Sequence, residues 1–417
     1  MVTNPLSARY LLRGQLADME RRGYAVTLVT SPGPDLVLTG RREGVETIGV
    51  RMRREIAPLS DLRSLRELTR VLRQVQPAIT KAGTPKAGLL GGLAAVATGV
   101  PCRVYMLRGL RMETATGFKR VLLWMAEWVA CRTAHRVISV SPSLLREAER
   151  LRLLRRGSGL VLGNGTSNGT DYRRFAVSAD RLSAARALRE ELQIPDSAPV
   201  VGFVGRLTTD KGILELLTAH RSLRERFPDL RLLLVGGTDP DDPLPVTTAS
   251  LLRSSPGVIE TGWLADTPSA YHAMNVLALP TLREGFPNVS LEAAAAGLPV
   301  VTTSATGAVD SVVDGVTGFI VPPRDPYLLA GALGRLLDDP QLARQMGDLG
   351  LARVQADFDQ HDVWDRIDGL FRQMTTESGI LEDGGHVRKR RLTGPLDTSR
   401  RHLASVLGRG ETLSHRD

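Results

Sequence analysis

This 417-residue chain has few cysteines, few aromatic residues and no long apolar run, so it has little from which to build disulfides, aromatic surfaces or membrane spans. Its two cysteines, Cys102 and Cys131, cannot build a disulfide framework or a cysteine-rich metal site, so we expect neither, and no bound metal. Aromatic residues make up 4% of the sequence, which leaves few side chains for base stacking and places nucleic acid last among the partners. No apolar run approaches the roughly twenty residues of a spanning helix. The first ten residues lack the apolar segment of a signal peptide, and these absences together predict a cytoplasmic protein.

Positive charge is present in excess and is concentrated in the first part of the chain. Residues 1–160 contain 27 lysines and arginines against 12 acidic residues, whereas the whole chain has a net charge of +9. This imbalance predicts an anionic partner, either a phospholipid surface or a polyprenyl diphosphate. The arginines between residues 51 and 73 fit two interpretations, a solvated surface or a contact with a membrane or acceptor. Peripheral attachment to the inner face of the plasma membrane is therefore a hypothesis.

Strand and helix signals alternate along most of the sequence, which predicts an α/β fold with parallel sheets and crossover helices. We expect two domains, residues 1–165 and 166–374, separated within the Gly- and Asn-rich stretch 160–175. Residues 375–417 are expected to be a disordered basic tail. A helix is predicted over residues 8–22. Only Val2 and Thr3 remain for the strand that should precede this helix, so the first strand is expected to be clipped.

The second predicted domain opens with an apolar strand over residues 200–204, followed by Gly205 and Arg206 and then by Lys211 and Gly212. A turn at the end of a parallel strand faces the crevice in which open α/β sheets bind ligands. Two fixed cations at that place can stabilise negative charge on a departing diphosphate. The alternative is that Arg206 and Lys211 are ordinary surface cations.

Residues 282–301 predict a loop, a short helix and a strand, with Glu284 in the loop and Glu292 in the helix. Asn288 or Ser290 can cap this helix, and Gly297 can end it in a left-handed conformation. Amides at the helix start can bind a phosphate, and Glu292, one turn further, can accept hydrogen bonds from two ribose hydroxyls. The alternative is that Glu292 only stabilises the helix dipole and that Glu284 is a solvated loop charge.

Together these motifs resemble the donor site of family four glycosyltransferases. The resemblance is carried by two glutamates with seven residues between them, by Gly-Phe-Pro after the first, and by the sequence EAAAAGLPVV from the second. Asn168, Gly169, Asp171 and Phe175 resemble the family's crossing between domains. The resemblance implies a GT-B fold, in which two Rossmann-like, doubly wound parallel-sheet domains face a cleft. It also implies transfer with retention of configuration, no cofactor, and a nucleotide-sugar co-substrate, most simply a UDP-sugar.

The resemblance also assigns roles to particular residues. Arg206 and Lys211 would neutralise the leaving diphosphate, and Glu284 would position the donor sugar as the third catalytic residue. Glu292 would bind the ribose. The other donor-binding candidates are Gly205, Gly285, Phe286, Pro287, Asn288, Val289, Ser290, Gly262, Trp263 and Gly14. No general base is assigned, because no histidine stands in these motifs.

Two stretches of the first predicted domain, residues 83–88 and 107–113, resemble family members that build capsules, exopolysaccharides or lipid-linked oligosaccharides. They make Lys86, Arg108 and Arg111 candidates for binding acceptor phosphate, with structural ion pairs as the alternative. The predicted activity is hexosyl or N-acetylhexosaminyl transfer to a hydroxyl of a glycan or polyprenyl-diphosphate-linked acceptor in cell-surface polysaccharide synthesis. Two alternatives remain, a UDP-sugar 2-epimerase of the same fold and an inactive membrane-associated scaffold.

Overall fold

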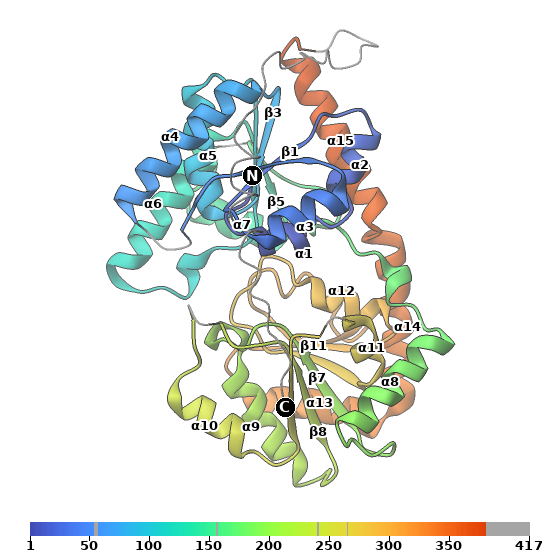
Figure 1. The fold of residues 1–417 in the computed structure, drawn as a ribbon. Coiled ribbons are helices and arrows are strands. Elements are labelled where there is room, and N and C mark those ends of the chain that lie inside the picture. Colours follow the sequence, from blue (N-terminus) through green and yellow to red (C-terminus); the bar gives the residue numbers. More distant parts are fainter. Residues whose placement is uncertain (54–56, 156, 240–241, 265, 381–417) are drawn as a thin grey trace, which may run out of the picture.

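The computed structural model describes residues 1–53, 57–155, 157–239, 242–264 and 266–380. Two α/β parts lie one above the other, and the last helix runs beside the first of them (Figure 1). Among the described residues, no helix is both long and apolar enough to cross a membrane.

The sheet of the second part has six parallel strands in the order β12-β11-β10-β7-β8-β9. Their bounds are β7 Val200–Val204, β8 Arg231–Val235, β9 Val258–Gly262, β10 Val276–Leu279, β11 Val300–Thr303 and β12 Gly318–Val321. Every residue of β7 and β10 is buried, as expected for central strands covered by helices on both faces. Because all strands run the same way, the loops after β7, β8 and β10 emerge at one edge of the sheet.

The first part contains β1 Thr27–Thr30 paired with β2 Glu46–Gly49, and a second sheet in the order β3-β4-β5-β6. The four strands of that sheet are β3 Ile79–Ala82, β4 Cys102–Leu107, β5 Arg136–Ser139 and β6 Gly159–Val161. Residues 1–3 lie between the two sheets. The amide of Val2 donates to the carbonyl of Val29 (3.0 Å), and the amide of Gly83 donates to the carbonyl of Met1 (2.9 Å). Three residues thus occupy the place of the expected first strand.

The helices surround these sheets. Their bounds are α1 Pro5–Leu11, α2 Gln15–Arg21, α3 Pro34–Glu43, α4 Pro58–Val75, α5 Pro85–Ala97, α6 Gly117–Thr133, α7 Pro142–Arg150, α8 Ala179–Glu191, α9 Ile213–Arg224, α10 Val246–Ser254, α11 Thr267–His272, α12 Asn288–Ala295, α13 Pro326–Asp338, α14 Pro340–Asp357 and α15 Gln360–Glu377, with 3-10 turns η1 Arg111–Glu113, η2 Tyr172–Arg174 and η3 Thr209–Lys211. The prediction of a single helix over residues 8–22 is wrong. The helix is interrupted before α2 because Gly14 adopts a left-handed conformation, with a φ of 77°.

The start of α12 also differs from the expectation. Pro287 is the N-cap residue, and Asn288 and Ser290 lie inside the helix, so neither predicted cap is correct. Gly297 does have the expected left-handed conformation, with a φ of 78°.

The last helix, α15, packs against the first part of the chain. Arg22 pairs with Asp365 (2.6 Å), and the phenol of Tyr24 donates to Asp368 (2.6 Å). The helix extends to Glu377, three residues beyond the predicted end of the folded region at residue 374. Most of the predicted tail, residues 381–417, lies outside the described residues. The predicted domain limit at residue 165 falls in the segment between β6 and α8.

Candidate active site

Arg206 is positioned by two glycines at the edge of the six-stranded sheet. Gly205 ends the strand β7 with its amide bonded to the carbonyl of Val235 (2.9 Å). A Cβ at Gly236 would lie 2.0 Å from the carbonyl oxygen of Gly205, so only glycine fits at position 236, where the two strand ends meet. This close approach directs the chain after β7 across the end of β8.

The two predicted diphosphate cations each face a carboxylate. Arg206 forms an ion pair with Asp239, which follows β8, and Lys211 forms one with Glu284, which follows β10. Three catalytic candidates therefore lie at the carboxyl ends of neighbouring strands, where the fold predicts a ligand. An incoming diphosphate would compete with Asp239 and Glu284 for the same two cations.

A second ion pair fixes the loop that carries Glu284. Arg283 binds Asp210 at 2.7 Å, and the hydroxyl of Thr208 donates to the same carboxylate at 2.5 Å. Burial alone would raise the pKa of Asp210, but Arg283, the Thr208 hydrogen bond and the charge of Lys211 together lower it. Asp210 therefore stays ionised and holds Arg283 in place through the ion pair.

Glu292 lies on α12 and is held by a buried tyrosine. The phenol of Tyr271, on α11, donates a hydrogen bond of 2.7 Å to the Glu292 carboxylate. Burial raises the pKa of Glu292, and the hydrogen bond from Tyr271 and the charge of Arg174 offset part of that rise. A carboxylate fixed in this way can accept hydrogen bonds from hydroxyl groups without first being ordered.

Gly285 joins the loop after β10 to the first part of the chain. A Cβ at this position would lie 2.3 Å from the carbonyl oxygen of Arg108, so the two backbones touch. The amide of Glu284 donates to the carbonyl of Thr306 (2.9 Å), and the hydroxyl of Thr306 donates to Glu113 (2.6 Å). The structure therefore brings the predicted donor loop and the motif at residues 107–113 into direct contact.

Several residues predicted to bind the donor through their backbone amides have side chains that take part in packing. Phe286 is buried with its ring centroid 5.3 Å from that of Phe358, and Val289 packs against the hydrophobic core. The hydroxyl of Ser290 is buried without a hydrogen-bond partner and lines a small internal cavity beside Thr317. This packing leaves the predicted role of their backbone amides unchanged.

The other donor candidates lie at separate places. Asn288 accepts a long hydrogen bond (3.5 Å) from Thr166. Gly262 ends β9, and Trp263 after it is 60% exposed beside Gly237. Gly14 packs against Trp364, since a Cβ there would lie 2.7 Å from the indole. The structure places Gly14 against α15 rather than beside Arg206 or Lys211.

The three predicted acceptor residues have different surroundings. Lys86 pairs with Asp61 at 2.6 Å, which is the alternative given above for that residue. The guanidinium nitrogens of Arg108 are buried and have no hydrogen-bond partner. Arg111 lies in η1, the turn whose Glu113 contacts Thr306.

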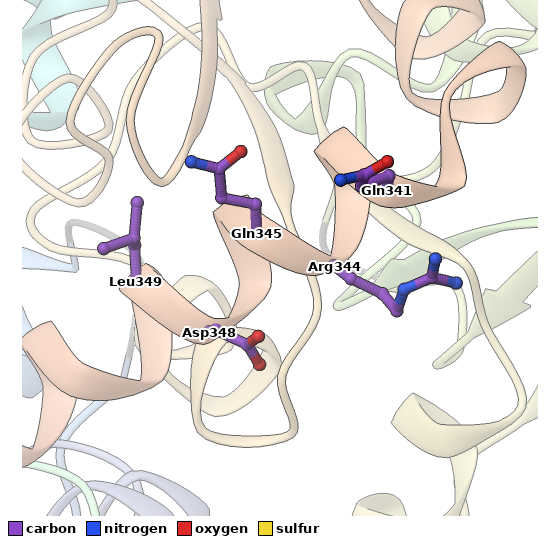
Figure 2. A pocket seen from close by; sticks show the side chains of 5 residues that line it. All are labelled: Gln341, Arg344, Gln345, Asp348 and Leu349. Atoms are coloured by element: carbon purple, nitrogen blue, oxygen red, sulfur yellow. The ribbon is translucent and has the colours of Figure 1, made fainter.

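A separate surface hollow does not coincide with any of these candidates. Figure 2 shows its lining side chains along α14, namely Gln341, Arg344, Gln345, Asp348 and Leu349. Since it contains none of the residues at the strand ends, we assign it no function.

Comparison with known proteins identifies the family. The family model described as "Glycosyl transferase 4-like domain" matches residues 8–165, and the one described as "Glycosyl transferases group 1" matches residues 198–339. The capsular polysaccharide biosynthesis glycosyltransferase CapM of Staphylococcus aureus is 34% identical over 368 residues, which are 88% of this chain and 95% of CapM. The chain belongs to the family four glycosyltransferases. It is therefore a glycosyltransferase, as the motifs predicted.

A further relative of this glycosyltransferase matches over a shorter stretch. The D-inositol 3-phosphate glycosyltransferase of Corynebacterium urealyticum is 38% identical over 179 residues, 41% of this chain and 42% of the relative.

Solved structures confirm the predicted GT-B fold. HepE of Anabaena, crystallised in complex with UDP, superposes with a TM-score of 0.73 at 21% identity, covering 89% of this chain and 98% of HepE. The sucrose-phosphate synthase of Thermosynechococcus elongatus superposes with a TM-score of 0.72 at 23% identity, covering 87% of this chain and 92% of that chain.

Three residues of the site were not found from the sequence. Asp239 forms an ion pair with Arg206, and Tyr271 donates a hydrogen bond to Glu292. Lys81 lies near Arg108. Asp239 follows two glycines at a strand end, a position that could have marked it. Lys81 is half-buried on β3, a strand of mixed polar and apolar residues, so the sequence offered no signal for it. Tyr271 has no local pattern that could have identified it.

Proposed function

We propose that this glycosyltransferase transfers a hexosyl or N-acetylhexosaminyl group from a UDP-sugar to a hydroxyl of a glycan or polyprenyl-diphosphate-linked acceptor, with retention of configuration. The product would serve cell-surface polysaccharide synthesis. The observation that carries the proposal is the convergence of Arg206, Lys211 and Glu284 at the ends of adjacent parallel strands. CapM, a capsular polysaccharide enzyme by name, and HepE, solved with UDP, support the choice of polymer and nucleotide.

In this proposal each residue has one task. The acceptor hydroxyl attacks from the side on which the diphosphate leaves, and Arg206 and Lys211 neutralise the departing phosphates without a metal. Glu292, held by Tyr271, accepts hydrogen bonds from the ribose. Glu284 and the backbone of residues 285–288 position the donor sugar. Exclusion of water by contact between the two parts limits hydrolysis of the donor.

The proposal places the enzyme at the inner face of the plasma membrane. Helix α6 exposes Phe118 (78%) and Val121 (52%) beside Lys119 and Arg120. Helix α4, which like α6 packs against α5, exposes Leu59 (82%) among arginines. Figure 1 shows α4, α5 and α6 together on one side of the first part. Exposed apolar side chains flanked by cations suit a bilayer that carries anionic lipids.

Thermal unfolding with UDP, GDP or ADP, each with and without EDTA, tests the donor site. A nucleotide at about 100 times its dissociation constant adds roughly 2.7 kcal/mol to the free energy of unfolding. We expect stabilisation by UDP, unchanged by EDTA and lost in Glu292→Ala. Arg344→Ala, a change at an exposed side chain of α14, is the control and should keep it.

Measurement of UDP release distinguishes glycosyl transfer from the 2-epimerase and scaffold alternatives. Release of UDP from a UDP-sugar should require an acceptor and should disappear in Arg206→Ala while the fold is retained. Equal release of UDP without an acceptor would identify the 2-epimerase reaction. Absence of stabilisation by all three nucleotides would favour the inactive scaffold.

A further inference from the structure

Arg108 is a buried cation without an anion. All three nitrogens of its guanidinium are inaccessible to solvent and lack a hydrogen-bond partner, although other atoms of the residue are partly exposed. Burial lowers the pKa of Arg108 to about 10, still well above neutrality, so the group stays charged. A buried charge with unsatisfied donors costs several kcal/mol, so its retention calls for a ligand.

A second cation lies next to it. Lys81, on β3, is half-buried, and its Nζ donates to the amide oxygen of Gln15 at 2.5 Å. Burial and the charge of Arg108 lower the pKa of Lys81 to about 7. The partner Gln15 is a neutral amide, so it does not balance the charge of Lys81. Among the described residues no carboxylate pairs with Lys81 or Arg108.

The positive end of a helix faces the same place. A Cβ at Gly83 would lie 3.4 Å from Cζ of Arg108, and α5 begins two residues later at Pro85. The first turn of α5 has no acidic residue. Thirteen residues of helix thus add their partial positive charge to those of Lys81 and Arg108.

We propose that Lys81, Arg108 and the start of α5 form an anion subsite that binds a phosphate group of the sugar acceptor. This inference rests on the proposed function and deepens it by naming the chemistry of the acceptor. Arg108 joins this subsite to the donor loop, because its backbone carbonyl touches Gly285. Lys86, which pairs with Asp61, is not part of the subsite.

A phosphate suits this subsite better than the donor's own diphosphate does. The donor cations Arg206 and Lys211 lie at the strand ends of the second part, whereas Lys81 and Arg108 belong to strands β3 and β4 of the first. Two cations and a helix start match two negative charges, as the diphosphate of a lipid-linked acceptor carries. Such a group can enter when the two parts separate at the contact between Arg108 and Gly285.

The test measures thermal unfolding with inorganic phosphate, with and without saturating UDP. We expect phosphate to raise the unfolding temperature of the wild type further when UDP already occupies the donor cations. Arg108→Gln and Lys81→Gln should keep the shift caused by UDP and weaken phosphate binding at least about 10-fold, the loss of one charge-assisted contact. Lys119→Gln, which removes an exposed charge from α6, is the matched control and should keep both shifts.

Other outcomes overturn the subsite. No phosphate shift in the wild type, or an equal shift in Arg108→Gln, would do so. Without phosphate, Arg108→Gln should unfold at the same or a higher temperature, because it removes an unpaired buried charge; a clear decrease would mean a structural role. A shift with glucuronate but not with phosphate would transfer the subsite to a carboxylate. Absence of the UDP shift alone would refute the proposed donor site, and the effect of phosphate on the unfolding temperature would still test the anion subsite.

Discussion

The phenol of Tyr271 donates a hydrogen bond of 2.7 Å to the carboxylate of Glu292. Tyr271 is fully buried, and its ring packs edge-on against Phe175, with the ring centroids 5.7 Å apart. Burial, followed by the neighbouring Glu292 charge, raises the pKa of Tyr271 above its ordinary value, so the hydroxyl keeps its proton and remains a donor. The carboxylate proposed to bind the ribose is therefore held by a residue that does not itself need to touch the substrate.

Tyr271→Phe keeps the ring and removes only this hydrogen bond. We expect UDP to bind about 10-fold more weakly, because Glu292 loses the partner that orients it, and a hydrogen bond to a charged group contributes roughly 1.5–3 kcal/mol. Calorimetric titration with UDP measures the effect, and KM for the donor should rise with little change in kcat. Tyr327→Phe, at an exposed tyrosine of α13, should leave both unchanged. Unaltered UDP affinity in Tyr271→Phe would contradict the positioning role.

The sequence predicted those parts of the site that are encoded locally. Arg206, Lys211, Glu284 and Glu292 follow strands or open helices, and their spacing reveals them because parallel strands end at one edge. Their partners Asp239 and Tyr271 belong to other elements. Only the folded chain shows which residue each partner meets; the strand end could have marked Asp239 as a candidate, but no local pattern could have identified Tyr271.

The errors in the fold prediction have the same origin. At the helix break, Gly14 adopts a left-handed conformation and packs against Trp364, which lies 350 positions further along the chain. Likewise, the sequence left open whether Lys86 binds the acceptor or forms a structural ion pair, because it does not reveal that Asp61 reaches this lysine. Helix periodicity is a short-range signal, and tertiary contacts decide where it is interrupted.

Glu127 should make stability depend on pH. Its carboxylate is buried and accepts a hydrogen bond of 2.6 Å from Tyr105, and burial raises its pKa from 4.5 to about 7. The folded protein therefore keeps a proton that the unfolded chain releases, so the contribution of Glu127 to stability is complete below pH 4.5 and falls until about pH 7. The loss attributable to this group is roughly 3 kcal/mol.

Glu127→Gln resembles the protonated carboxyl group, so that decrease should disappear. Denaturant unfolding at pH 5 and pH 8 measures it in both proteins. Titration of Lys81 increases stability as the pH rises above about 7, which is the opposite effect. This effect is the same in the wild type and in Glu127→Gln, so it cancels when the two proteins are compared. Glu191→Gln, at an exposed position of α8, should retain the wild-type dependence. The same decrease in Glu127→Gln as in the wild type would contradict the assignment.

Gly285→Ala should reduce catalysis by displacing the donor loop. The new Cβ would lie 2.3 Å from the carbonyl oxygen of Arg108, and backbone atoms cannot yield as a flexible side chain could. A misplacement of about 1 Å costs on the order of 100-fold in rate, and we expect a fall in kcat of that size with the fold retained. Gly331→Ala, on α13 with nothing within 4 Å, is the control and should be neutral or stabilising. Wild-type turnover in Gly285→Ala would show that the contact is not needed for catalysis.

Membrane attachment should depend on the exposed face of α6. Phe118 and Val121 lie three residues apart and share a side of the helix, so replacing both with serine removes the apolar contact while leaving Lys119 and Arg120. We expect less co-sedimentation with vesicles that contain phosphatidylglycerol, and weaker wild-type binding at high salt. Tyr327→Ser, an exposed aromatic on α13, should bind like the wild type. Equal binding of all three proteins would argue against this face.

Glu284→Gln separates the two roles of that carboxylate. Glu284 holds Lys211 in an ion pair, and the diphosphate of the donor needs the same cation. Removing the negative charge frees Lys211, so UDP, which carries no sugar, should bind more tightly by a few-fold, the size of a partly screened ion pair. The donor sugar loses its positioning carboxylate, so kcat should fall by at least about 100-fold.

Opposite changes in UDP affinity and kcat are the signature of this arrangement. A residue that only maintained the fold would weaken both, and a solvated loop charge would change neither. Lys211→Met provides the complementary measurement, because it removes the cation and should weaken UDP binding while leaving Glu284 without its partner. If Glu284→Gln weakened UDP binding as much as Lys211→Met does, Glu284 would be orienting the lysine rather than competing with the diphosphate for it.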